Sequence, residues 1–138
     1  MGIKFLSKSV LLATLTLVCT LGTHAQLPTP ESKKIDEFKA VLTQHLWRYQ
    51  HPARPNAPLR FQMEGKCESI AFKGHWTVKG GRAIEINKDG DHQKARLLFT
   101  EDMTSFEASW FDGSVVKGRS DGELSKIDAA SLNSYFKK

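Results

Sequence analysis

The sequence predicts a mainly β protein of the α+β class, an antiparallel meander of six or seven short strands preceded by an amphipathic helix. Apolar residues recur every three or four positions over 35–46, which indicates a helix. From residue 59 they alternate with polar residues, and turn signals recur about every 10 residues. Connections this short exclude parallel βαβ units. The meander is therefore expected to form a small barrel or a strongly curled sheet.

Residues 1–25 have the three parts of a secretory signal peptide. Lys4 and Lys8 form a positive start, residues 10–21 are largely apolar, and small residues occupy positions −3 and −1 of a cleavage after Ala25. The apolar run is shorter than the roughly 20 residues of a membrane-spanning helix. We therefore expect a secreted or periplasmic protein with no stable membrane insertion after cleavage.

Cleavage would change the composition of the chain that folds. Of 138 residues 113 would remain, and basic residues would fall from 20 to 18 against 15 acidic ones, so the net charge would be +3. A charge this small, spread along the chain, is too weak for a nucleic-acid partner. Cys19 would leave with the signal, so Cys67 would be a free thiol, either buried or paired with another chain. The oligomeric state is left open.

The first predicted element is the helix within residues 26–58. Thr29 fits the N-cap position and Pro30 the first helical position. Three prolines between His51 and Pro58 end the helix and predict a Pro-rich loop. The apolar stripe consists of Ile35, Phe38, Val41, Leu42 and Leu46.

Residues 59–138 are predicted to be the antiparallel β-domain with a C-terminal tail or short helix, and 26–138 to fold as one domain. Residues 125–128 have the spacing of a capping box, with Asp128 in place of the usual Glu or Gln. The first alternating set is Leu59, Phe61 and Met63. The predicted turns are 65–66, 79–82, 87–91, 100–102 and 112–113.

Two pairs of short motifs carry a family resemblance. Leu-Trp-Arg-Tyr at 46–49 precedes Phe-Gln-Met-Glu-Gly at 61–65, and Gly-His-Trp-Thr-Val at 74–78 precedes Gly-Arg-Ala-Ile-Glu-Ile at 81–86. They resemble the Trp-containing first strand and the Gly-x-Trp hairpin of the lipocalin-like group of small secreted β-barrel domains. In a proper lipocalin, Gly-x-Trp lies in the first of eight full-length strands, whereas here it lies in mid-sheet. The resemblance implies a barrel that binds apolar or saccharide ligands, and no chemistry.

Large aromatic residues and arginines are the candidate ligand-binding groups. Tryptophans either stack on sugar rings and apolar ligands or pack in the core, and strand arginines either anchor a ligand or form cross-strand ion pairs. The predicted pocket is lined by Trp47, Phe61, Trp76 and Trp110, with Arg60 or Arg82 as the polar anchor.

No motif for catalysis or for a cofactor stands out. The histidines lack zinc-ligand spacing, so we expect no metal site, and no Gly-rich phosphate loop or Gly-x-Ser-x-Gly elbow is present. Cys67 and His75 are the only nucleophile and base worth pairing, and the pairing requires them to meet in space.

The sequence thus favours an exported, non-enzymatic binding or accessory protein for an apolar or saccharide ligand or an envelope component. One alternative is a small secreted hydrolase or an enzyme inhibitor. Another is a structural protein that contacts its partners through a sheet edge. No cofactor is expected in any of these readings.

Overall fold

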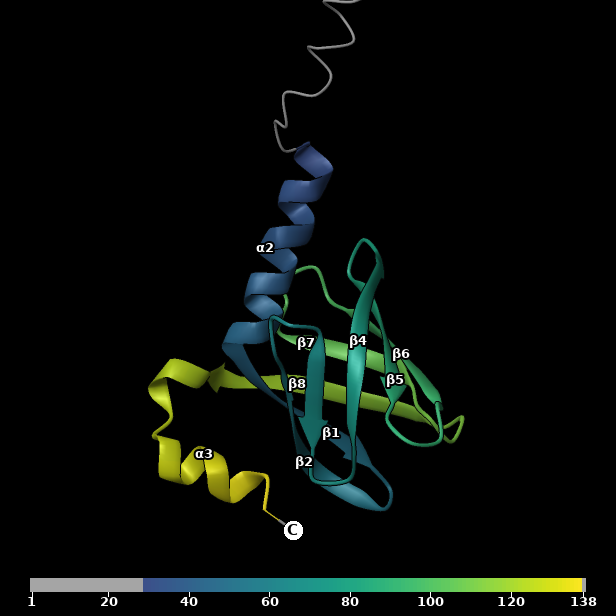
Figure 1. Cartoon of the computed structure of the whole chain (residues 1–138), viewed down its shortest axis with the longest axis vertical. Coiled ribbons are helices and arrows are strands. Elements are labelled where there is room, and N and C mark those ends of the chain that lie inside the picture. The colour runs from purple at the N-terminus through teal and green to yellow at the C-terminus, as the bar shows by residue number, and fades with distance from the viewer. Residues whose placement is uncertain (1–28, 138) are drawn as a thin grey trace, which may run out of the picture. The chain divides into compact units, whose positions relative to one another are not determined.

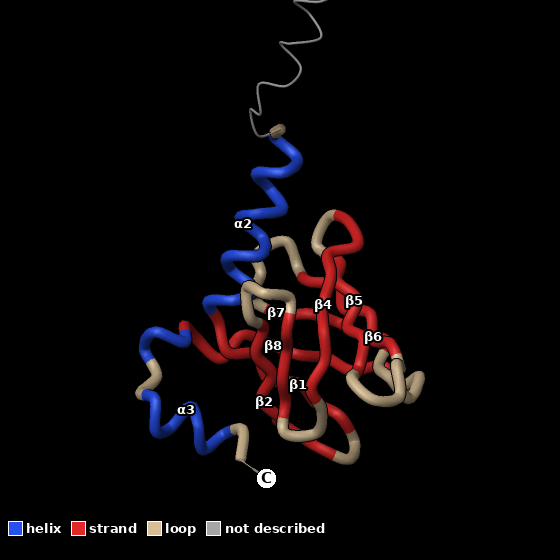
Figure 2. Tube along the Cα trace, viewed as in Figure 1, coloured by secondary structure: helices blue, strands red, loops and turns tan. Residues whose placement is uncertain are grey.

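The protein forms a closed antiparallel β-barrel with a helix at each end of the described chain. The computed structural model describes residues 29–137, and the predicted signal peptide lies outside them. Eight strands pair in sequence order, and β8 pairs with β1 to close the barrel (Figures 1 and 2). The strands are β1 (His45–His51), β2 (Arg54–Phe61), β3 (Lys66–Ser69), β4 (Lys73–Gly80), β5 (Ala83–Lys88), β6 (Lys94–Phe99), β7 (Ser105–Ser109) and β8 (Val115–Glu123). The helices are α2 (Pro30–Gln44), the short 3₁₀ helix η1 (Leu124–Lys126) and α3 (Ala129–Tyr135).

The count of six or seven strands was too low, because two strands lack a clear alternating signal. β3 has only four residues, and its two outward positions, Lys66 and Glu68, are charged. β1 follows α2 without a break at His45, inside the stretch that the apolar stripe assigns to the helix. Pairing with their neighbours makes these segments strands, and this pairing is a tertiary effect.

The Pro-rich run also differs from the prediction, because much of it belongs to β2 instead of a loop. The half of β2 from Arg54 to Pro58 pairs with β1, while its ladder to β3 begins only at Leu59. A strand with one unpaired edge tolerates proline, which has no N–H to donate. The β-structure therefore begins at residue 45 instead of 59.

Aromatic side chains fill the interior of the barrel. The ring centroids of Trp47 and Phe99 are 5.0 Å apart, and those of Phe99 and Phe106 are 5.2 Å apart. Phe38, from the second half of α2, makes an edge contact with Phe99 at 5.6 Å. Met63, expected on the apolar side of β2, lies beyond the end of that strand and is exposed.

Strand order determines which loops share an end of the barrel. Because the strands alternate in direction, the β1–β2, β3–β4, β5–β6 and β7–β8 connections all lie at one end, which we call the distal end. The other end holds the start of β1, and there Phe38 and Leu42 of α2 join the core. Residues from four separate hairpins therefore meet at the distal end.

The C-terminal segment contains a short helix, one of the two predicted forms, but this helix begins three residues later than the capping-box spacing at 125–128 predicts. Asp128 is the N-cap of α3 and accepts a hydrogen bond from the Ser131 N–H at 2.9 Å, while Ser125 lies within η1. Tyr135 lies against the guanidinium of Arg48, with 4.9 Å between the guanidinium carbon and the ring centroid. None of the helices described is both long and apolar enough to cross a bilayer.

The space for Phe106 tests this core. Gly118 on β8 lies directly opposite Phe106 on β7, and a methyl group at position 118 would overlap the ring. We expect Gly118→Ala to lower the free energy of unfolding by about 1–3 kcal/mol, measured by urea denaturation.

The matched control is the same substitution beside a smaller side chain. In a Phe106→Leu background, Gly118→Ala should cost much less, because the ring that it overlaps is gone. An equal cost in both backgrounds would contradict the packing described.

Candidate functional site

A pocket of about 180 Å³ at the distal end is the best-formed candidate site. It receives residues from all four connections at that end, so the closed barrel assembles it. Apolar rings form one part of its wall and charged side chains form another. Its lining residues are Tyr49, His51, Ala53, Arg54, Ala71, Phe72, Lys88, Gln93, Trp110, Phe111 and Asp112.

Four aromatic rings form a connected layer between this distal pocket and the core. The Trp110 ring centroid is 4.6 Å from that of Tyr49, 5.7 Å from that of Phe72 and 5.0 Å from that of Phe111. Tyr49, Phe72 and Trp110 are buried, and Phe111 is half-buried at the rim. These flat apolar surfaces suit stacking against a ring-shaped ligand.

The floor of the pocket carries a neutral hydroxyl. The Tyr49 hydroxyl and the Ser69 hydroxyl are hydrogen-bonded at 3.0 Å. Burial raises the pKa of Tyr49 above its ordinary value, although the Ser69 hydrogen bond and the positive charge of Arg54 both lower it. Tyr49 therefore remains a protonated phenol at neutral pH, able to donate or accept a hydrogen bond.

Charged groups surround the mouth of the pocket. His51 Nε2 lies 2.8 Å from Asp112 Oδ2, across the β1–β2 and β7–β8 loops. Hydrogen bonds from the Ser114 hydroxyl and N–H, together with the one to His51, hold the pKa of Asp112 well below its ordinary value. Lys88 lies 5.8 Å from the centre of the Phe111 ring. The Asp112 carboxylate is thus already hydrogen-bonded, and the Lys88 ammonium lies 3.3 Å from the Asp91 carboxylate. Arg54 supplies a further positive charge at the mouth.

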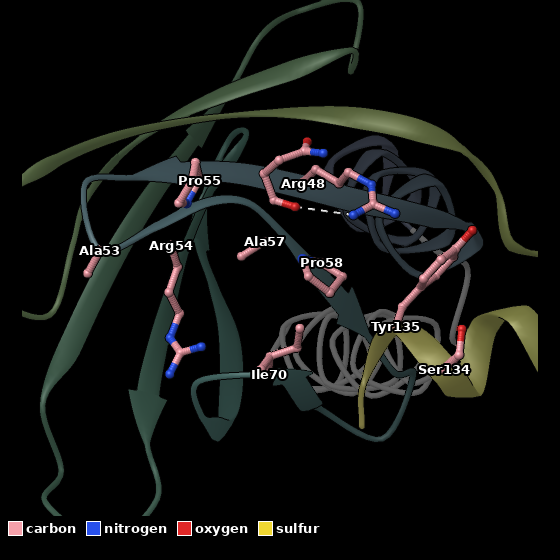
Figure 3. Close-up of a pocket in the computed structure, with 10 residues that line it drawn as sticks. Arg48, Ala53, Arg54, Pro55, Ala57, Pro58, Ile70, Ser134 and Tyr135 are labelled. Atoms are coloured by element: carbon pink, nitrogen blue, oxygen red, sulfur yellow. Dashed lines mark hydrogen bonds between the residues drawn. The ribbon is translucent and has the colours of Figure 1, made fainter. Parts of the chain in front are cut away.

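A second hollow, of about 400 Å³, lies between β2 and α3 (Figure 3). Arg48 points across it toward Tyr135, and its guanidinium donates to the Asn56 carbonyl oxygen at 3.2 Å. The same guanidinium bonds Asp121 at 2.6 Å. Arg48 is thus already paired, and Arg54, which also lines this hollow, is shared with the distal pocket. Tyr135 is the one aromatic residue of its lining, so this hollow lacks the layer of aromatic rings that lines the distal pocket.

The structure separates the four predicted aromatic ligand contacts. Trp47, Phe61 and Trp76 are buried among the core residues and do not line the distal pocket. The indole N–H of Trp76 donates to the Gln62 and Lys66 carbonyl oxygens, both at 3.0 Å. Trp110 alone of the four lines the pocket.

The two predicted arginine anchors lie elsewhere. Arg60 forms an ion pair with Glu68 on the neighbouring strand β3, and the ring of Phe136 lies 4.8 Å from its guanidinium carbon. The Arg82 Nε–H donates to the Phe99 carbonyl oxygen at 3.0 Å, near the end opposite the pocket. Neither arginine lines the distal pocket.

Cys67 and His75 do not meet. Cys67 on β3 is buried inside the barrel and lies opposite Gly74 on β4. His75 follows Gly74 on β4, so its side chain points to the outer face of the sheet and is exposed. Burial and the negative charges of Asp89 and Glu68 raise the pKa of the Cys67 thiol to about 12, against a hydrogen bond with Gly74 that lowers it. In residues 29–137 no three His, Cys, Asp or Glu side chains are grouped as metal ligands.

Comparison with family models, with curated protein sequences and with solved structures gives no match to this chain. The closed antiparallel barrel agrees with the fold that the lipocalin-like motifs imply, at the level of architecture.

Sequence reasoning did not identify Tyr49, Phe72, Phe111 or Arg54 as site residues. The available signal was positional, because all four lie at strand ends or in connections that an up-and-down order brings to the same end. Using that signal requires the correct number of strands. Omitting β1 and β3 removes the hairpins that carry Tyr49, Arg54 and Phe72, whereas the β7–β8 hairpin that carries Phe111 was predicted.

The buried thiol yields a pH-dependent prediction. Because the pKa of Cys67 rises from 9.0 unfolded to about 12 folded, the unfolded chain loses this proton first as pH rises. The contribution of the Cys67 thiol to the free energy of unfolding is therefore fully present below pH 9. Between pH 9 and 12 the free energy of unfolding falls by about 1.4 kcal/mol per pH unit.

Urea unfolding at pH 8 and pH 10 measures this effect, with Cys67→Ala as the comparison. The fall in unfolding free energy should be smaller in the variant, whatever its absolute stability. Equal slopes, or rapid alkylation of the folded wild-type thiol by iodoacetamide at pH 8, would show that Cys67 is accessible.

Proposed function

We propose that this chain is a non-enzymatic binding protein that holds a small ring-shaped ligand, saccharide or apolar, in the distal pocket. The observation that carries the proposal is the aromatic layer of Tyr49, Phe72, Trp110 and Phe111 at the one end of the barrel where four connections converge. We also propose that the protein is exported, on the strength of its first 25 residues.

The dimensions of the pocket favour one ring over a long ligand. Drug-sized ligands occupy pockets of about 300–1,000 Å³. The distal pocket has about 180 Å³, enough for a single sugar or aromatic ring or for the end of a longer molecule. A large ligand inside the barrel, as in a roomy lipocalin cup, has little support because Trp47, Phe61 and Phe99 occupy the interior.

The polar groups suit a ligand that carries hydroxyl or anionic groups on the edge of its ring. Tyr49 supplies a neutral hydroxyl, Arg54 and Lys88 supply donors, and Gln93 supplies an amide. A ring stacked on Trp110 would present its edge to these groups. This combination of an apolar face and a polar edge is that of a pyranose ring.

The alternatives have weaker support. A cysteine hydrolase needs a reactive thiolate, and Cys67 is buried with a pKa of about 12. A sheet-edge interaction needs an open edge, and closure leaves mainly the short unpaired edge of β2 at Arg54–Pro58.

The intrinsic fluorescence of Trp110 tests the proposal. A panel of monosaccharides and small aromatic acids should include one that changes the tryptophan emission saturably, because the ligand covers Trp110. Trp110→Phe should remove most of that signal, and Trp110→Ala should weaken binding by about 5- to 20-fold, measured by calorimetry.

The control variant is Met63→Ala, whose side chain is exposed near the other end of the barrel. It should bind like the wild type. Native mass spectrometry of the protein from its own host provides the second arm. A clean apo mass together with no binding in the panel would refute the proposed function.

A further inference from the structure

A buried carboxylate on the outer surface of the barrel organises three cations. Glu85 on β5 points outward, yet it is only 3% exposed because long side chains cover it. Its carboxylate lies 3.3 Å from Arg96 Nε, 3.6 Å from Lys79 Nζ and 3.7 Å from Lys94 Nζ. Three positive groups from the two strands that flank β5, Lys79 on β4 and Lys94 and Arg96 on β6, are thus held at one place, and they exceed the single negative charge by two.

The electrostatics of this cluster keep Glu85 ionised. Burial acts to raise its pKa, but the charges of Lys79, Lys94 and Arg96 outweigh burial and leave the pKa below its ordinary value. The three cations meanwhile keep more than half of their side-chain surface exposed. The carboxylate therefore positions the cations without covering their outer sides.

The positive surface continues along β6 toward β8. A shallow hollow of about 460 Å³ adjoins the cluster and is lined in part by Arg82, Leu98, Glu107 and Lys117. We call the surface formed by Lys79, Arg82, Glu85, Lys94, Arg96, Leu98, Glu107, Val115 and Lys117 the basic face. Its five cations and two carboxylates give it a net charge of +3.

A neighbouring charge cluster on β8 leaves this excess unchanged. Arg119, farther along β8, lies 3.8 Å from Asp121, whose carboxylate also pairs with Arg48, so these three groups do not reduce the positive charge. On the far side of the barrel, α3 covers part of β1 and β2 through Arg48 and Tyr135, whereas β5 and β6 lie away from it (Figure 1). The basic face is therefore exposed in the described chain.

Two exposed apolar side chains lie among the cations. Leu98 is 59% exposed and Val115 is 67% exposed, and with Met63 they are the large exposed hydrophobic residues of the described chain. Leu98 follows Lys94 and Arg96 on the outward side of β6. Ser109 on β7 pairs with Arg96 on one side and with Val115 on the other, so Val115 and Arg96 point to the same face of the sheet. Cations flanked by protruding apolar groups are suited to a lipid surface, where both headgroup charge and acyl chains are available.

We propose that the basic face docks the protein on the surface of a membrane that contains anionic lipids. Lys79, Lys94, Arg96 and Lys117 would neutralise phosphate headgroups, and Leu98 would enter the boundary between headgroups and acyl chains. An anionic polysaccharide would use the cations equally but would leave Leu98 and Val115 without a role. This proposal does not rest on the distal pocket, which lies in a different set of residues.

Vesicle sedimentation tests the proposal. The protein, purified in the form that accumulates in its host, should sediment with phosphatidylcholine vesicles that contain about one third phosphatidylglycerol, and not with phosphatidylcholine alone. The double variant Lys94→Gln/Arg96→Gln should lose about 20-fold in affinity. Leu98→Ser should lose about 3- to 10-fold, and Glu107→Gln should bind more tightly because it removes a negative charge from the face.

Matched controls separate the face from general charge and hydrophobicity. Lys126→Gln/Lys137→Gln removes two exposed cations elsewhere, and Met63→Ser removes an exposed apolar side chain elsewhere. Both variants should lose less than twofold in affinity for the anionic vesicles if the basic face is the docking site. Each variant is checked for folding by its urea midpoint before its binding is compared.

Two results would overturn the proposal. The first is vesicle binding that does not depend on phosphatidylglycerol, or whose affinity falls equally in the basic-face variants and in their controls. The second is retention on dextran sulfate with no sedimentation on anionic vesicles, which would assign the face to a soluble polyanion. Failure of ligand binding at the distal pocket would leave the vesicle result unchanged, so the two proposals are tested separately.

Discussion

The pairing of β1 with β8 is the constraint on which the rest of the structure depends. Residues His45 to Gln50 of β1 form a ladder with Lys117 to Glu123 of β8, and this contact turns a meander into a closed barrel. Closure removes the open edges that a curled sheet would expose. It also encloses Trp47 and Tyr49 and brings the β7–β8 loop beside the β1–β2 loop, where Asp112 meets His51.

Because the barrel is small, its interior is occupied by its own side chains, and this moves binding to its outside. Trp47, Phe61, Phe99 and Phe106 leave the interior as a packed core, in keeping with eight-stranded barrels just wide enough to be filled. Two kinds of surface remain for recognition. One is the distal end, where the core layer of Trp110 and Phe72 is incompletely covered, and the other is the outward face of the strands.

The outward face shows how a weak overall charge becomes a local one. Basic residues are spread along the sequence, and acidic residues offset most of their charge. Alternation along β6 places Lys94 and Arg96 on the same side, and the β4–β5–β6 ladder brings Lys79 to them around Glu85. Sequence distance does not reveal this gathering, because Lys79 and Lys94 are 15 positions apart and come together only through cross-strand neighbours.

The sequence by itself determined the class of fold, since periodicity and turn residues are local signals. The helical stripe that begins at Ile35, the alternation from Leu59, and the turns at Gly90 and Gly113 are all set by side chains near one another in the chain. The strand character of β1 and β3, the proline-bearing half of β2 and the closure of the barrel were decided by tertiary structure. Their stability comes from partners distant in sequence, such as Lys66–Ser69 between β2 and β4. The division of tryptophans, with Trp47 and Trp76 in the core and Trp110 at the distal pocket, follows from the same cause. Alternation shows that a side chain points inward, but only the length and closure of the barrel determine whether that position is its centre or its end.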